Sequence, residues 1–342
     1  MRACVIHAAG DLRVEDVPDG APGESEASVA VSLGGICGSD LHYWRHGGVG
    51  DFSVREPMVL GHEIVGEVLA TGAAVGWMEP GARVAIHPAT VCGHCAECRA
   101  GRPNICRNVR YLGSAARMPH VQGGFREHLT VPADQLRAIP DGLPSDRAVL
   151  AEPLAVGLHA LARAGGVEGR RVLVTGAGPI GCLVAAGARA RGAKEVVVSD
   201  LLDEPLEVAR KVGATATARA DQEDSPDWPD ELDVAVEASG APAGLATCMR
   251  RVRRGGVVVQ LGMLPPGEVP FLGNLVVTRE IELRGAFRFD TEFDEVLALL
   301  AGGLDVDALV TATVPLANAP EAFALAADRR RASKVLLEVG TG

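Results

Sequence analysis

Cys37, His62 and Glu63 bring a thiol, an imidazole and a carboxylate together in one stretch, residues 34–63. These are donors that Zn²⁺ prefers, and a catalytic zinc takes three protein ligands and leaves one position for water or substrate. Because 25 residues (62 − 37) separate the thiol from the imidazole, tertiary folding must close the site. Gly61 can supply the backbone bend that lets the neighbouring side chains of His62 and Glu63 reach one ion. Gly-His-Glu alone would equally be a turn with a core histidine, but together with Cys37 it predicts an open metal site.

A second cluster of cysteines has the spacing CxxCxxCx7C. Its members are Cys92, Cys95, Cys98 and Cys106. Four thiolates satisfy a tetrahedral Zn²⁺ completely, so this loop predicts a structural zinc site with no open position. Two disulfides are the alternative, which the absence of a secretory signal and a reducing compartment disfavour. We interpret His94, inside the loop, as a surface residue, and expect Cys4, Cys182 and Cys248 to be buried small apolar side chains.

A glycine motif of the form GxGxxG joins an apolar strand to a helix at Gly176, Gly178 and Gly181. The first glycine permits a tight turn, the second lets the backbone approach a pyrophosphate, and the third allows helix and strand to pack. The N-terminus of the helix stabilises phosphate charge. The motif alone is weak in a chain with 42 glycines, but a strand before it and a helix after it give it the context of a dinucleotide site.

The next strand ends in Asp200, 19 residues (200 − 181) beyond the last glycine. A carboxylate there hydrogen-bonds the ribose 2′-OH of NAD and repels the 2′-phosphate of NADP. Asp203 and Glu204 add to that repulsion, and the first arginine or lysine after Asp200 is Arg210. The pattern therefore predicts NAD as the cofactor.

Two further features leave alternatives open. Glu152 precedes a proline at the start of a helical pattern, where it serves the first metal directly or through water, or is a helix-start charge stabilised by the macrodipole. A run of arginines forms either an anion-attracting rim near the cleft or a solvated, salt-bridged lobe or subunit contact. Its members are Arg99, Arg102, Arg107, Arg110 and Arg117.

The elements that must position these residues fall into two kinds. The first 90 residues or so show short alternating strands at 2–8, 12–17, 27–35, 63–72 and 82–88. Their alternation and spacing predict a small all-β barrel, with the first metal stretch on connecting segments between two strands.

The later part of the chain alternates strands and helices from about residue 171. Strands are expected at 172–176, 195–200, 233–240, 255–263 and 280–287, and they predict a doubly wound parallel sheet. An amphipathic helix follows Phe287, and the terminal strand, 333–339, returns most economically to the N-terminal barrel. We therefore expect a catalytic domain formed by 1–150 and 287–342 and a cofactor domain formed by 151–286.

Composition limits the classes of function. A chain of 342 residues suits two domains, and 47% hydrophobic with 4% aromatic residues fits an α/β protein. A net charge of −11 argues against a general nucleic-acid or anionic-membrane binder and leaves small molecules as partners. The N-terminus lacks the apolar core of a signal peptide, and no apolar run approaches the roughly 18 residues of a membrane span. We expect a cytoplasmic protein.

The whole chain resembles the zinc-dependent medium-chain dehydrogenases, in their polyol or sorbitol branch, through GGICGSDLHYW, PMVLGHE, CGHCAEC, AEPLAVGLHA, GAGPIGCL and LRGAFRF. The phrases CGSDLHYW with GGVGDF, YLGSAARMPHVQGGF and RGAFRFDTEF are especially similar to the L-idonate 5-dehydrogenases. The resemblance implies a GroES-like β-barrel catalytic domain, a Rossmann domain, one catalytic and one structural zinc, NAD, and a homodimer or homotetramer. Pro205 stands where the family often has a basic residue beside the cofactor ribose.

The resemblance also implies roles for individual residues. Cys37, His62 and Glu63 would hold the catalytic zinc, with Glu152 on its water or on the substrate. Ser39 and His42 match the proton relay of the family, although His42 could equally be a surface loop residue, and Tyr43 and Arg288 would contact the substrate. The implied cofactor contacts are Gly176, Gly178, Pro179, Ile180, Gly181, Asp200, Leu261, Gly262 and Phe287.

The implied reaction is oxidation of the C5 hydroxyl of L-idonate to 5-keto-D-gluconate. We expect the C1 carboxylate of such an aldonate to face the segment from Arg110 to His120, because a partly desolvated carboxylate needs a cationic partner. The alternatives are another zinc dehydrogenase, acting on sorbitol, xylitol, threonine or simple alcohols, and a catalytically silent NAD-binding scaffold protein. Intact metal and relay residues argue against the silent protein.

Overall fold

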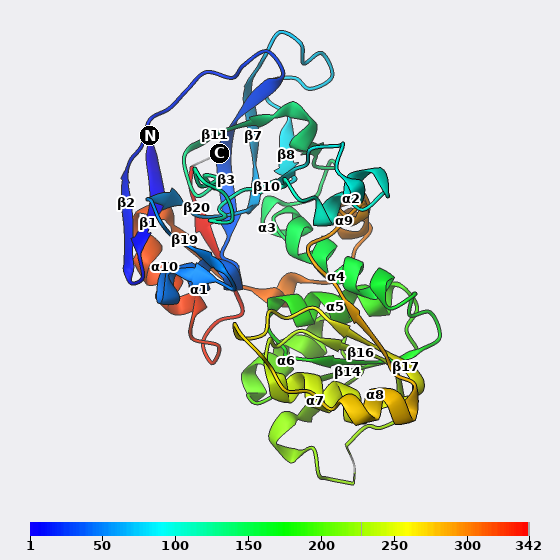
Figure 1. The fold of residues 1–342 in the computed structure, drawn as a ribbon. Helices are drawn as coiled ribbons and strands as arrows, with labels where there is room; N and C mark the ends of the chain where they lie inside the picture. Colours follow the sequence, from blue (N-terminus) through cyan, green and yellow to red (C-terminus); the bar gives the residue numbers. More distant parts are fainter. Residues whose placement is uncertain (227, 341–342) are drawn as a thin grey trace.

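The computed structural model describes residues 1–226 and 228–340. The chain forms two lobes, one mostly of β-structure and one built on a parallel sheet (Figure 1). Among the described residues, no helix combines the length and the apolar character that crossing a bilayer requires.

The β lobe is organised around one sheet with the strand order β12-β8-β7-β3-β20-β19, in which β11 also pairs with β3. Its strands are β3 (Glu26–Gly35), β7 (Glu63–Thr71), β8 (Arg83–Ile86), β11 (His128–Pro132), β12 (Leu136–Ala138), β19 (Val310–Pro315) and β20 (Lys334–Glu338). A smaller sheet has the order β2-β1-β6, with β1 (Arg2–Ala8), β2 (Asp11–Asp16) and β6 (Met58–Val59). Two short pairs are β4 (Gly48–Val49) with β5 (Phe52–Ser53) and β9 (Ala89–Thr90) with β10 (Arg110–Tyr111).

The second lobe contains a parallel sheet with the order β15-β14-β13-β16-β17-β18. Its strands are β13 (Arg171–Thr175), β14 (Glu195–Asp200), β15 (Ala216–Arg219), β16 (Leu232–Glu237), β17 (Val252–Gln260) and β18 (Glu282–Gly285). Helices α4 and α5 cover one face, and α7 and α8 cover the other (Figure 1). The strand order reverses direction between β13 and β16, and ligands of such sheets bind in the crevice at the carboxyl ends of the strands at that point.

The longer helices are α1 (Gly38–His46), α4 (Ala151–Arg163), α5 (Pro179–Ala190), α6 (Asp203–Val212), α7 (Pro242–Arg251), α8 (Gly273–Arg279), α9 (Glu292–Ala301) and α10 (Ala319–Ala326). Short helical turns are α2 (Ala96–Arg99), α3 (Ser145–Ala148), η1 (Pro103–Ile105), η2 (Ala133–Gln135), η3 (Ala220–Gln222), η4 (Asp307–Leu309) and η5 (Leu316–Asn318).

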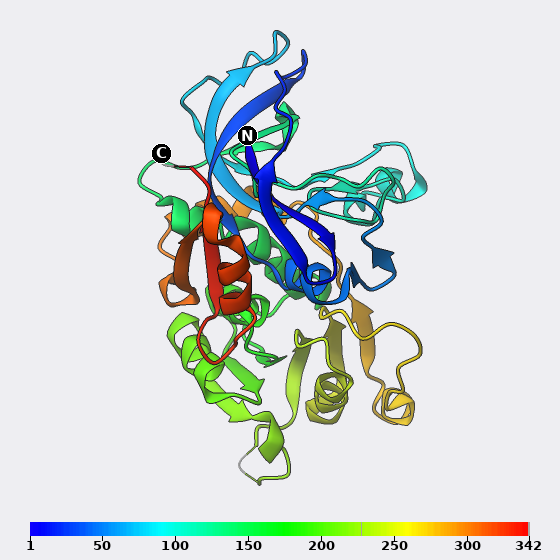
Figure 2. The same ribbon diagram turned by 90° about the vertical axis from the view of Figure 1, so that its left-hand side faces the viewer.

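The C-terminal segment belongs to the β lobe. Strand β20 pairs antiparallel with β3, Leu336 opposite Gly35, and parallel with β19. Figures 1 and 2 show this red segment, with α10, packed beside the blue N-terminal strands. The last strand thus lies where the sequence analysis expected it. The domain boundaries at 150 and 287 stay a prediction.

An apolar core runs through the junction of the two lobes. It joins Leu154 and Leu158 of α4 to Leu183 of α5 and Phe293 of α9, all buried. Because protein interiors are close-packed, this contact holds the lobes in one relative position and fixes the cleft between them.

The first metal stretch is not entirely loop. The sequence analysis placed it on connecting segments, but residues 38–46 form α1. The carboxylate of Asp40 accepts a hydrogen bond from the backbone N–H of Cys37 at 2.9 Å, so an acid in the first turn satisfies a free donor at the helix start. Cys37 therefore lies on a rigid helix end.

Candidate functional site

The thiol, imidazole and carboxylate of the first metal stretch meet where β3 and β7 run side by side. Cys37 follows β3, and Glu63 opens β7, where it pairs with Gly35 across the ladder. The candidate ligand atoms of Cys37, His62 and Glu63 all lie within 4.8 Å of one another. Pairing of distant strands thus closes a site whose ligands are far apart in the sequence.

Gly61 makes the bend that presents His62 and Glu63 together. Its φ is +97°, a backbone conformation that residues with a Cβ rarely adopt. A Cβ at this position would also lie 2.3 Å from the ring of Phe125. The structure therefore requires glycine here for both reasons.

Two side chains that the sequence analysis missed support these ligands. Asp40 is fully buried, and its carboxylate lies 3.9 Å from Nδ1 of His62, where it stabilises positive charge on the ring. Lys334 is also buried and donates from Nζ to both oxygens of Glu63 at 2.7 Å. The sequence offered a signal for Asp40, because it lies three residues after the metal-ligand candidate Cys37. It offered no such signal for Lys334.

The electrostatics of this cluster suit a divalent cation. Burial lowers the pKa of His62, but the nearby Cys37 and Asp40 outweigh burial and raise the pKa well above its usual value. Such a field stabilises positive charge at the imidazole, and the donor set of thiol, imidazole and carboxylate is one that zinc uses. The residues present therefore fit a zinc ion with an open position.

Glu152 lies beside this cluster without joining it. It opens α4, lines the same cavity as Cys37 and His62, and accepts a hydrogen bond from the hydroxyl of Tyr111 at 2.6 Å. Burial raises the pKa of Glu152 to about 6. A buried carboxyl group titrating near neutrality can bind a hydroxyl or water as acceptor or donor.

Arg288 contributes a partly buried cation to the cavity. Its guanidinium lies over the rings of Tyr111, at 4.3 Å, and Phe287, at 4.6 Å. Within the described residues Nη1 of Arg288 is buried without a hydrogen-bond partner. Unpaired buried donors are costly, so this group is poised for an acceptor on a ligand. Arg288 also has φ +57°, unusual for a residue with a side chain.

A buried polar network holds the backbone just before Arg288. The amide of Asn104, in η1, donates to the carbonyl of Phe287 at 3.0 Å and lies 3.3 Å from Nε2 of His159. Nδ1 of His159 lies 2.9 Å from Glu292, so this network assigns the His159 proton to Nδ1 and makes Nε2 an acceptor. Asn104 thus ties the cysteine loop to the Arg288 backbone.

Helix α1 directs three predicted residues into the cavity, namely Ser39, His42 and Tyr43. Tyr43 is buried, and its hydroxyl accepts a hydrogen bond from the backbone N–H of Ala115 at 3.0 Å. His42 is exposed at the cavity edge. Partial burial, with help from His46 and Arg45, lowers the pKa of His42. Its neutral form therefore persists to lower pH than for a free histidine.

The four cysteines of the second cluster converge as one set. Their sulfur atoms lie within 4.8 Å of one another, with Cys106 3.5 Å from Cys92 and 3.8 Å from Cys95. All eight cysteines are free. Tetrahedral zinc with Zn–S bonds of about 2.3 Å places its sulfurs roughly 3.8 Å apart, so these thiols fit a structural zinc and not a pair of disulfides. His94 is exposed and outside the set.

The glycine motif lies at the carboxyl end of β13. Gly176 has φ +93°, and a Cβ on Gly181 would lie 1.9 Å from the carbonyl oxygen of Gly176. A Cβ on Gly178 would meet no atom within 4 Å, so this position faces open space at the start of α5. These are the turn, the close approach and the tight packing that a dinucleotide motif needs.

Asp200 has a cationic partner that its neighbours in the sequence do not supply. The residues near it in sequence offer no cation, but Arg329, from the segment after α10, pairs with the Asp200 carboxylate at 2.5 Å. Glu204 is likewise paired with Arg330 at 3.3 Å, and Asp203 with Arg219 at 3.1 Å. In the folded chain these acidic side chains therefore have arginine partners that the residues directly after Asp200 do not supply.

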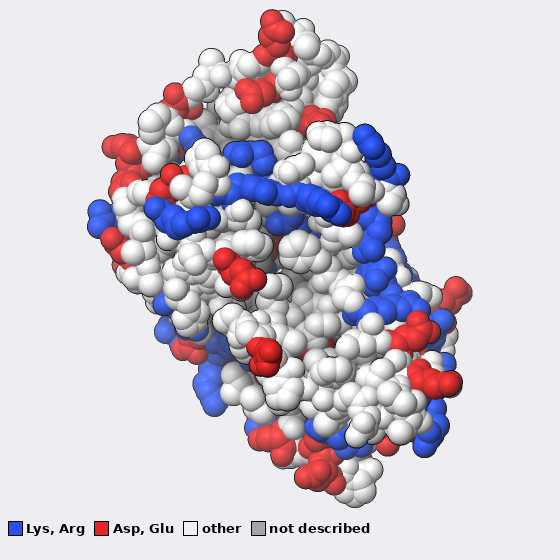
Figure 3. Space-filling model, in the orientation of Figure 1, with Lys and Arg blue, Asp and Glu red and all other residues white. Residues whose placement is uncertain are grey.

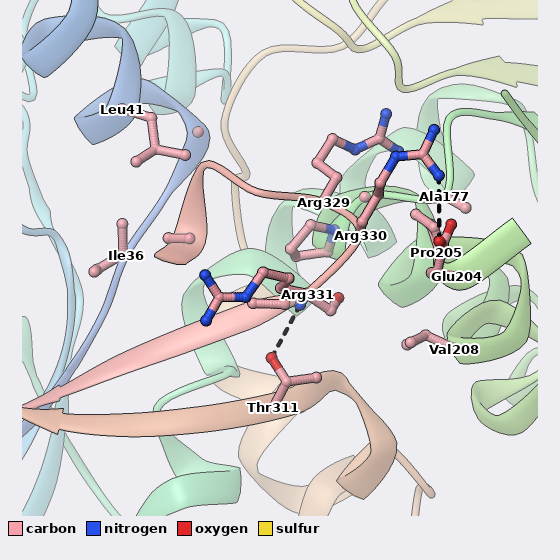
Figure 4. Close-up of a pocket in the computed structure, with 16 residues that line it drawn as sticks. Ile36, Leu41, Ala177, Glu204, Pro205, Val208, Thr311, Arg329, Arg330 and Arg331 are labelled. Atoms are coloured by element: carbon pink, nitrogen blue, oxygen red, sulfur yellow. Dashed lines mark hydrogen bonds and ion pairs between the residues drawn. The ribbon is translucent and has the colours of Figure 1, made fainter. Parts of the chain in front are cut away.

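Two adjoining cavities, which share Gly38, hold most of the predicted residues. The larger, about 380 Å³, is lined by Cys37, Ser39, His42, Tyr43, His62, Glu152, Ile180, Leu261, Gly262, Phe287 and Arg288, with others. The smaller, about 240 Å³, is lined by Gly178 and Pro179 with the arginine segment (Figure 4). Glu63 lies behind the larger cavity, on Lys334.

The expected carboxylate site between Arg110 and His120 stays a prediction, and Tyr111, Leu112, Gly113 and Ser114 of that segment line the larger cavity. Neither Arg110, Arg117 nor His120 lines the larger cavity. Arg117 donates from Nε to the carbonyl of Val109 at 3.1 Å. On the face in Figure 3, basic side chains form a band across the upper lobe, but the basic residue that reaches the metal cluster's cavity is Arg288.

Comparison with known proteins follows the same division of the chain. Residues 23–141 match the family profile described as alcohol dehydrogenase GroES-like domain, and residues 179–302 match the profile described as zinc-binding dehydrogenase. The chain is 38% identical to the L-idonate 5-dehydrogenase (NAD(P)(+)) of Escherichia coli K12, over 90% of both chains. It is 35% identical to a sorbitol dehydrogenase of Bacillus subtilis, over 94% of this chain and 92% of the relative. The crystal structure of the L-idonate 5-dehydrogenase of E. coli K-12 superposes with a TM-score of 0.93 at 36% identity, covering 99% of this chain and 98% of that one.

Proposed function

The chain belongs to the zinc-dependent medium-chain polyol dehydrogenase family, and on that premise we propose that it oxidises the C5 hydroxyl of L-idonate to 5-keto-D-gluconate with NAD as hydride acceptor. The observation that carries the substrate is the guanidinium of Arg288. It is a partly buried cation, in the cavity of Cys37 and His62, whose buried Nη1 has no hydrogen-bond partner among the described residues. A sugar acid supplies the carboxylate that this group lacks, whereas a neutral polyol leaves its charge uncompensated.

A zinc ion on Cys37, His62 and Glu63 would supply Lewis-acid polarisation of the hydroxyl, and NAD would accept the hydride. The chain's own residues bind and orient the substrate and remove its proton. Ser39 can accept and donate a proton at one oxygen, and His42, neutral and at the cavity edge, can pass that proton to solvent.

Glu152 and Arg288 orient the substrate from the other side of the cavity. Tyr111 fixes one oxygen of Glu152, which leaves the second oxygen for a substrate hydroxyl. Arg288 takes the place of the segment from Arg110 to His120 as the partner of the C1 carboxylate. This revision retains the expected substrate and changes the residue that recognises it.

Sorbitol or xylitol is the second candidate substrate. The B. subtilis relative is a sorbitol dehydrogenase at 35% identity, and the hydroxyl-bearing side chains of Ser39, Tyr43 and Ser114 line the cavity. These groups could bind hydroxyls along a neutral chain. The two candidate substrates differ in their dependence on Arg288. L-idonate has a carboxylate that can pair with the guanidinium, whereas sorbitol and xylitol do not.

The experiment is a steady-state comparison of L-idonate, sorbitol and xylitol with wild type, Arg288→Gln and Arg288→Lys. We expect L-idonate to have the highest kcat/KM. Arg288→Gln should raise the KM for L-idonate by roughly tenfold or more, the loss expected for one charge-assisted contact, and alter the KM for sorbitol much less. Arg288→Lys should recover part of the loss. Equal effects on both substrates, or a better kcat/KM for sorbitol, would refute the aldonate and leave the neutral polyol.

The assembly that we propose is a homo-oligomer formed through β18. This strand is the edge of the parallel sheet, with Leu283 exposed, and Val277 on the neighbouring α8 is 76% exposed. An edge strand offers unpaired backbone groups to another strand. Antiparallel pairing of two copies about Leu283 would set Glu282 of each opposite Arg284 of the other, a favourable cross-strand pair.

A further inference from the structure

Helix α1 carries two histidines one turn apart, His42 and His46. Residues at positions i and i+4 of a helix lie on the same face, with Cβ atoms about 5–6 Å apart. Both side chains are exposed, and their ring centroids lie 5.7 Å apart with the ring planes at 37°. Two imidazoles thus stand side by side at the rim of the larger cavity, which His42 lines.

These two histidines differ from the other seven (9 − 2) in the chain. In each of the others a ring nitrogen has a partner, which is a carboxylate for His7, His62, His128 and His159 and a backbone group for His87, His94 and His120. Within the part of the chain that the structure describes, the rings of His42 and His46 form no hydrogen bond or ion pair and contact only each other. Their ring nitrogens are therefore available to a ligand.

The spacing of the pair suits a metal ion. Two Zn–N bonds of about 2.1 Å at a tetrahedral angle place the centroids of two imidazole rings roughly 5 Å apart. The observed 5.7 Å therefore needs only a small rotation of the side chains. Imidazole is a ligand that zinc, copper and nickel prefer, whereas magnesium and calcium prefer oxygen. Two histidines at this helical spacing are also the arrangement by which some helices bind zinc.

The helix holds the two rings in place and favours a cation beside them. Tyr43 is buried, and its carbonyl accepts the backbone N–H of Gly47 at 2.9 Å, which closes the last turn. His46 is the last residue of α1, and the carboxyl end of a helix stabilises positive charge. The guanidinium of Arg45 is engaged elsewhere, since it donates to the carbonyl of Ala327 at 3.3 Å.

We propose that His42 and His46 form a third metal site, which binds Zn²⁺ or another late divalent transition metal at the rim of the cavity. Water would complete the coordination of the ion. Two protein ligands hold an ion more weakly than three or four, so we expect dialysis to remove this ion and to leave the two at the cysteine-containing sites.

A metal at this site would slow the proposed reaction. A relay through an imidazole accepts a proton at one ring nitrogen and releases one from the other. A metal and a proton compete for the same lone pair, so an ion on either nitrogen of His42 stops the relay. The site itself rests on the geometry of α1, whereas this effect on the rate rests on the role of His42 in the proposed function.

The first experiment measures zinc binding without turnover. Zn²⁺ is titrated calorimetrically into the dialysed full chain, with its two cysteine-containing sites loaded, as wild type, His46→Gln and His128→Gln. Wild type should bind one further ion. His46→Gln should weaken that ion by tenfold or more, because loss of even a supporting group costs a metal site roughly 10–100-fold. His128→Gln, which removes a 41% exposed imidazole paired with Asp19, should leave the ion unchanged.

Two results of this titration would overturn the site. The first is saturation of wild type at two zinc ions per chain. The second is equal weakening in His46→Gln and His128→Gln, which would mean that zinc binds to surface histidines in general.

The second experiment measures kcat while Zn²⁺ or Mg²⁺ is added to the same variants. Without added metal, His46→Gln should turn over like wild type, because His46 does not line the cavity. Added zinc should lower the kcat of wild type, and the same inhibition of His46→Gln should need at least about ten times more zinc. Mg²⁺ should inhibit neither, since it prefers oxygen ligands. Equal inhibition of both variants by zinc would place the inhibitory ion elsewhere and overturn the proposal.

The site and the proposed function fail in different ways. A third zinc that is lost in His46→Gln but does not inhibit wild type supports the site and overturns the relay role of His42. The same loss in a chain that oxidises no polyol or aldonate supports the site and overturns the proposed reaction. A working dehydrogenase that binds only two zinc ions overturns the site and leaves the proposed function intact.

Discussion

At the scale of single residues, each cysteine cluster has a chemistry of its own. Cys37 stands in a cavity among residues suited to substrate, whereas Cys95 belongs to a loop in which the thiols lie against one another and accept hydrogen bonds from backbone N–H groups. The first set leaves a ligand position open, and the second is complete. A zinc ion is thus expected to take part in catalysis at the first site and to stabilise the fold at the second.

Metal analysis tests this division. Because each chain has two complete donor sets, emission spectrometry of the purified protein should find two zinc ions per chain. Cys37→Ser should lower activity strongly with a small change in Tm. Cys95→Ser should lower Tm and lose one zinc, because structural zinc contributes folding energy directly. Equal loss of activity in both variants with unchanged melting would contradict the assignment.

His42 predicts a particular pH dependence. Only its neutral form can accept a proton, and its pKa is lowered by partial burial and by His46 and Arg45. The wild-type rate should therefore begin to fall at a lower pH than an unshifted histidine would give, when His42 becomes charged. His42→Gln should lower kcat near neutral pH by roughly tenfold, less than the hundredfold or more of a base that touches the reacting atom, and the gap should close at high pH. A gap independent of pH would exclude His42 as the proton acceptor.

At the scale of elements, the cysteine loop also fixes the backbone next to Arg288. Its short helix η1 carries Asn104, which holds the carbonyl of Phe287 and so the backbone that places Arg288 in a left-handed conformation. An arginine kept in this conformation needs such support. The loop that is expected to hold the structural zinc therefore positions Arg288, the residue that we propose recognises the substrate.

Asn104→Ala should raise the KM for L-idonate by roughly threefold to tenfold, with kcat within about twofold, because one buried hydrogen bond worth about 1 kcal/mol is lost. Asn318→Ala, at an exposed asparagine elsewhere in the chain, is the matched control. In an Arg288→Gln background the substitution should add nothing to KM, since the group that it positions is gone. Additive effects would mean that Asn104 acts elsewhere.

Strand β20 brings a buried charge to the metal cluster. Lys334 is 1% exposed and bonds both oxygens of Glu63. Lys334→Met would leave the Glu63 carboxylate without its cation, and breaking a buried pair in this way costs about 3–5 kcal/mol. Urea unfolding in the presence of a zinc chelator should show that loss. Lys194→Met, at an exposed lysine, should change the free energy of unfolding by less than about 0.5 kcal/mol; similar losses in both would show that the pair is not stabilising.

At the scale of the whole molecule, the exposed apolar side chains of α8 and β18 predict self-association. Light scattering on the purified wild type should give a mass of two or four chains. Val277→Glu with Leu283→Glu places like charges on both sides of the expected contact and should shift the mass toward one chain of 35.4 kDa. Trp77→Glu, at another exposed apolar residue, should not. A single-chain mass for wild type would refute the assembly.

The sequence by itself determined the features that depend on local pattern. The spacing of the cysteines, the glycine motif between a strand and a helix, and the acid at the end of β14 specify ligand types and a fold class, because each constraint acts within a turn or a single βα unit. The bend at Gly61 was predictable for the same reason, since it depends on the backbone conformation of one residue, whereas the contact with Phe125 came only from the tertiary structure.

The tertiary structure alone decided which charges meet. Lys334 reaches Glu63 across 271 positions, and Arg329 reaches Asp200 across 129. Those pairs depend on β20 joining β3 and on two lobes packing through one core. Spacing along the chain carries no record of such long-range contacts. The same limit applies to the carboxylate site. The sequence analysis placed it at Arg110–His120, where cationic residues are dense, and we now propose Arg288 instead, because its Nη1 is buried without a partner among the described residues.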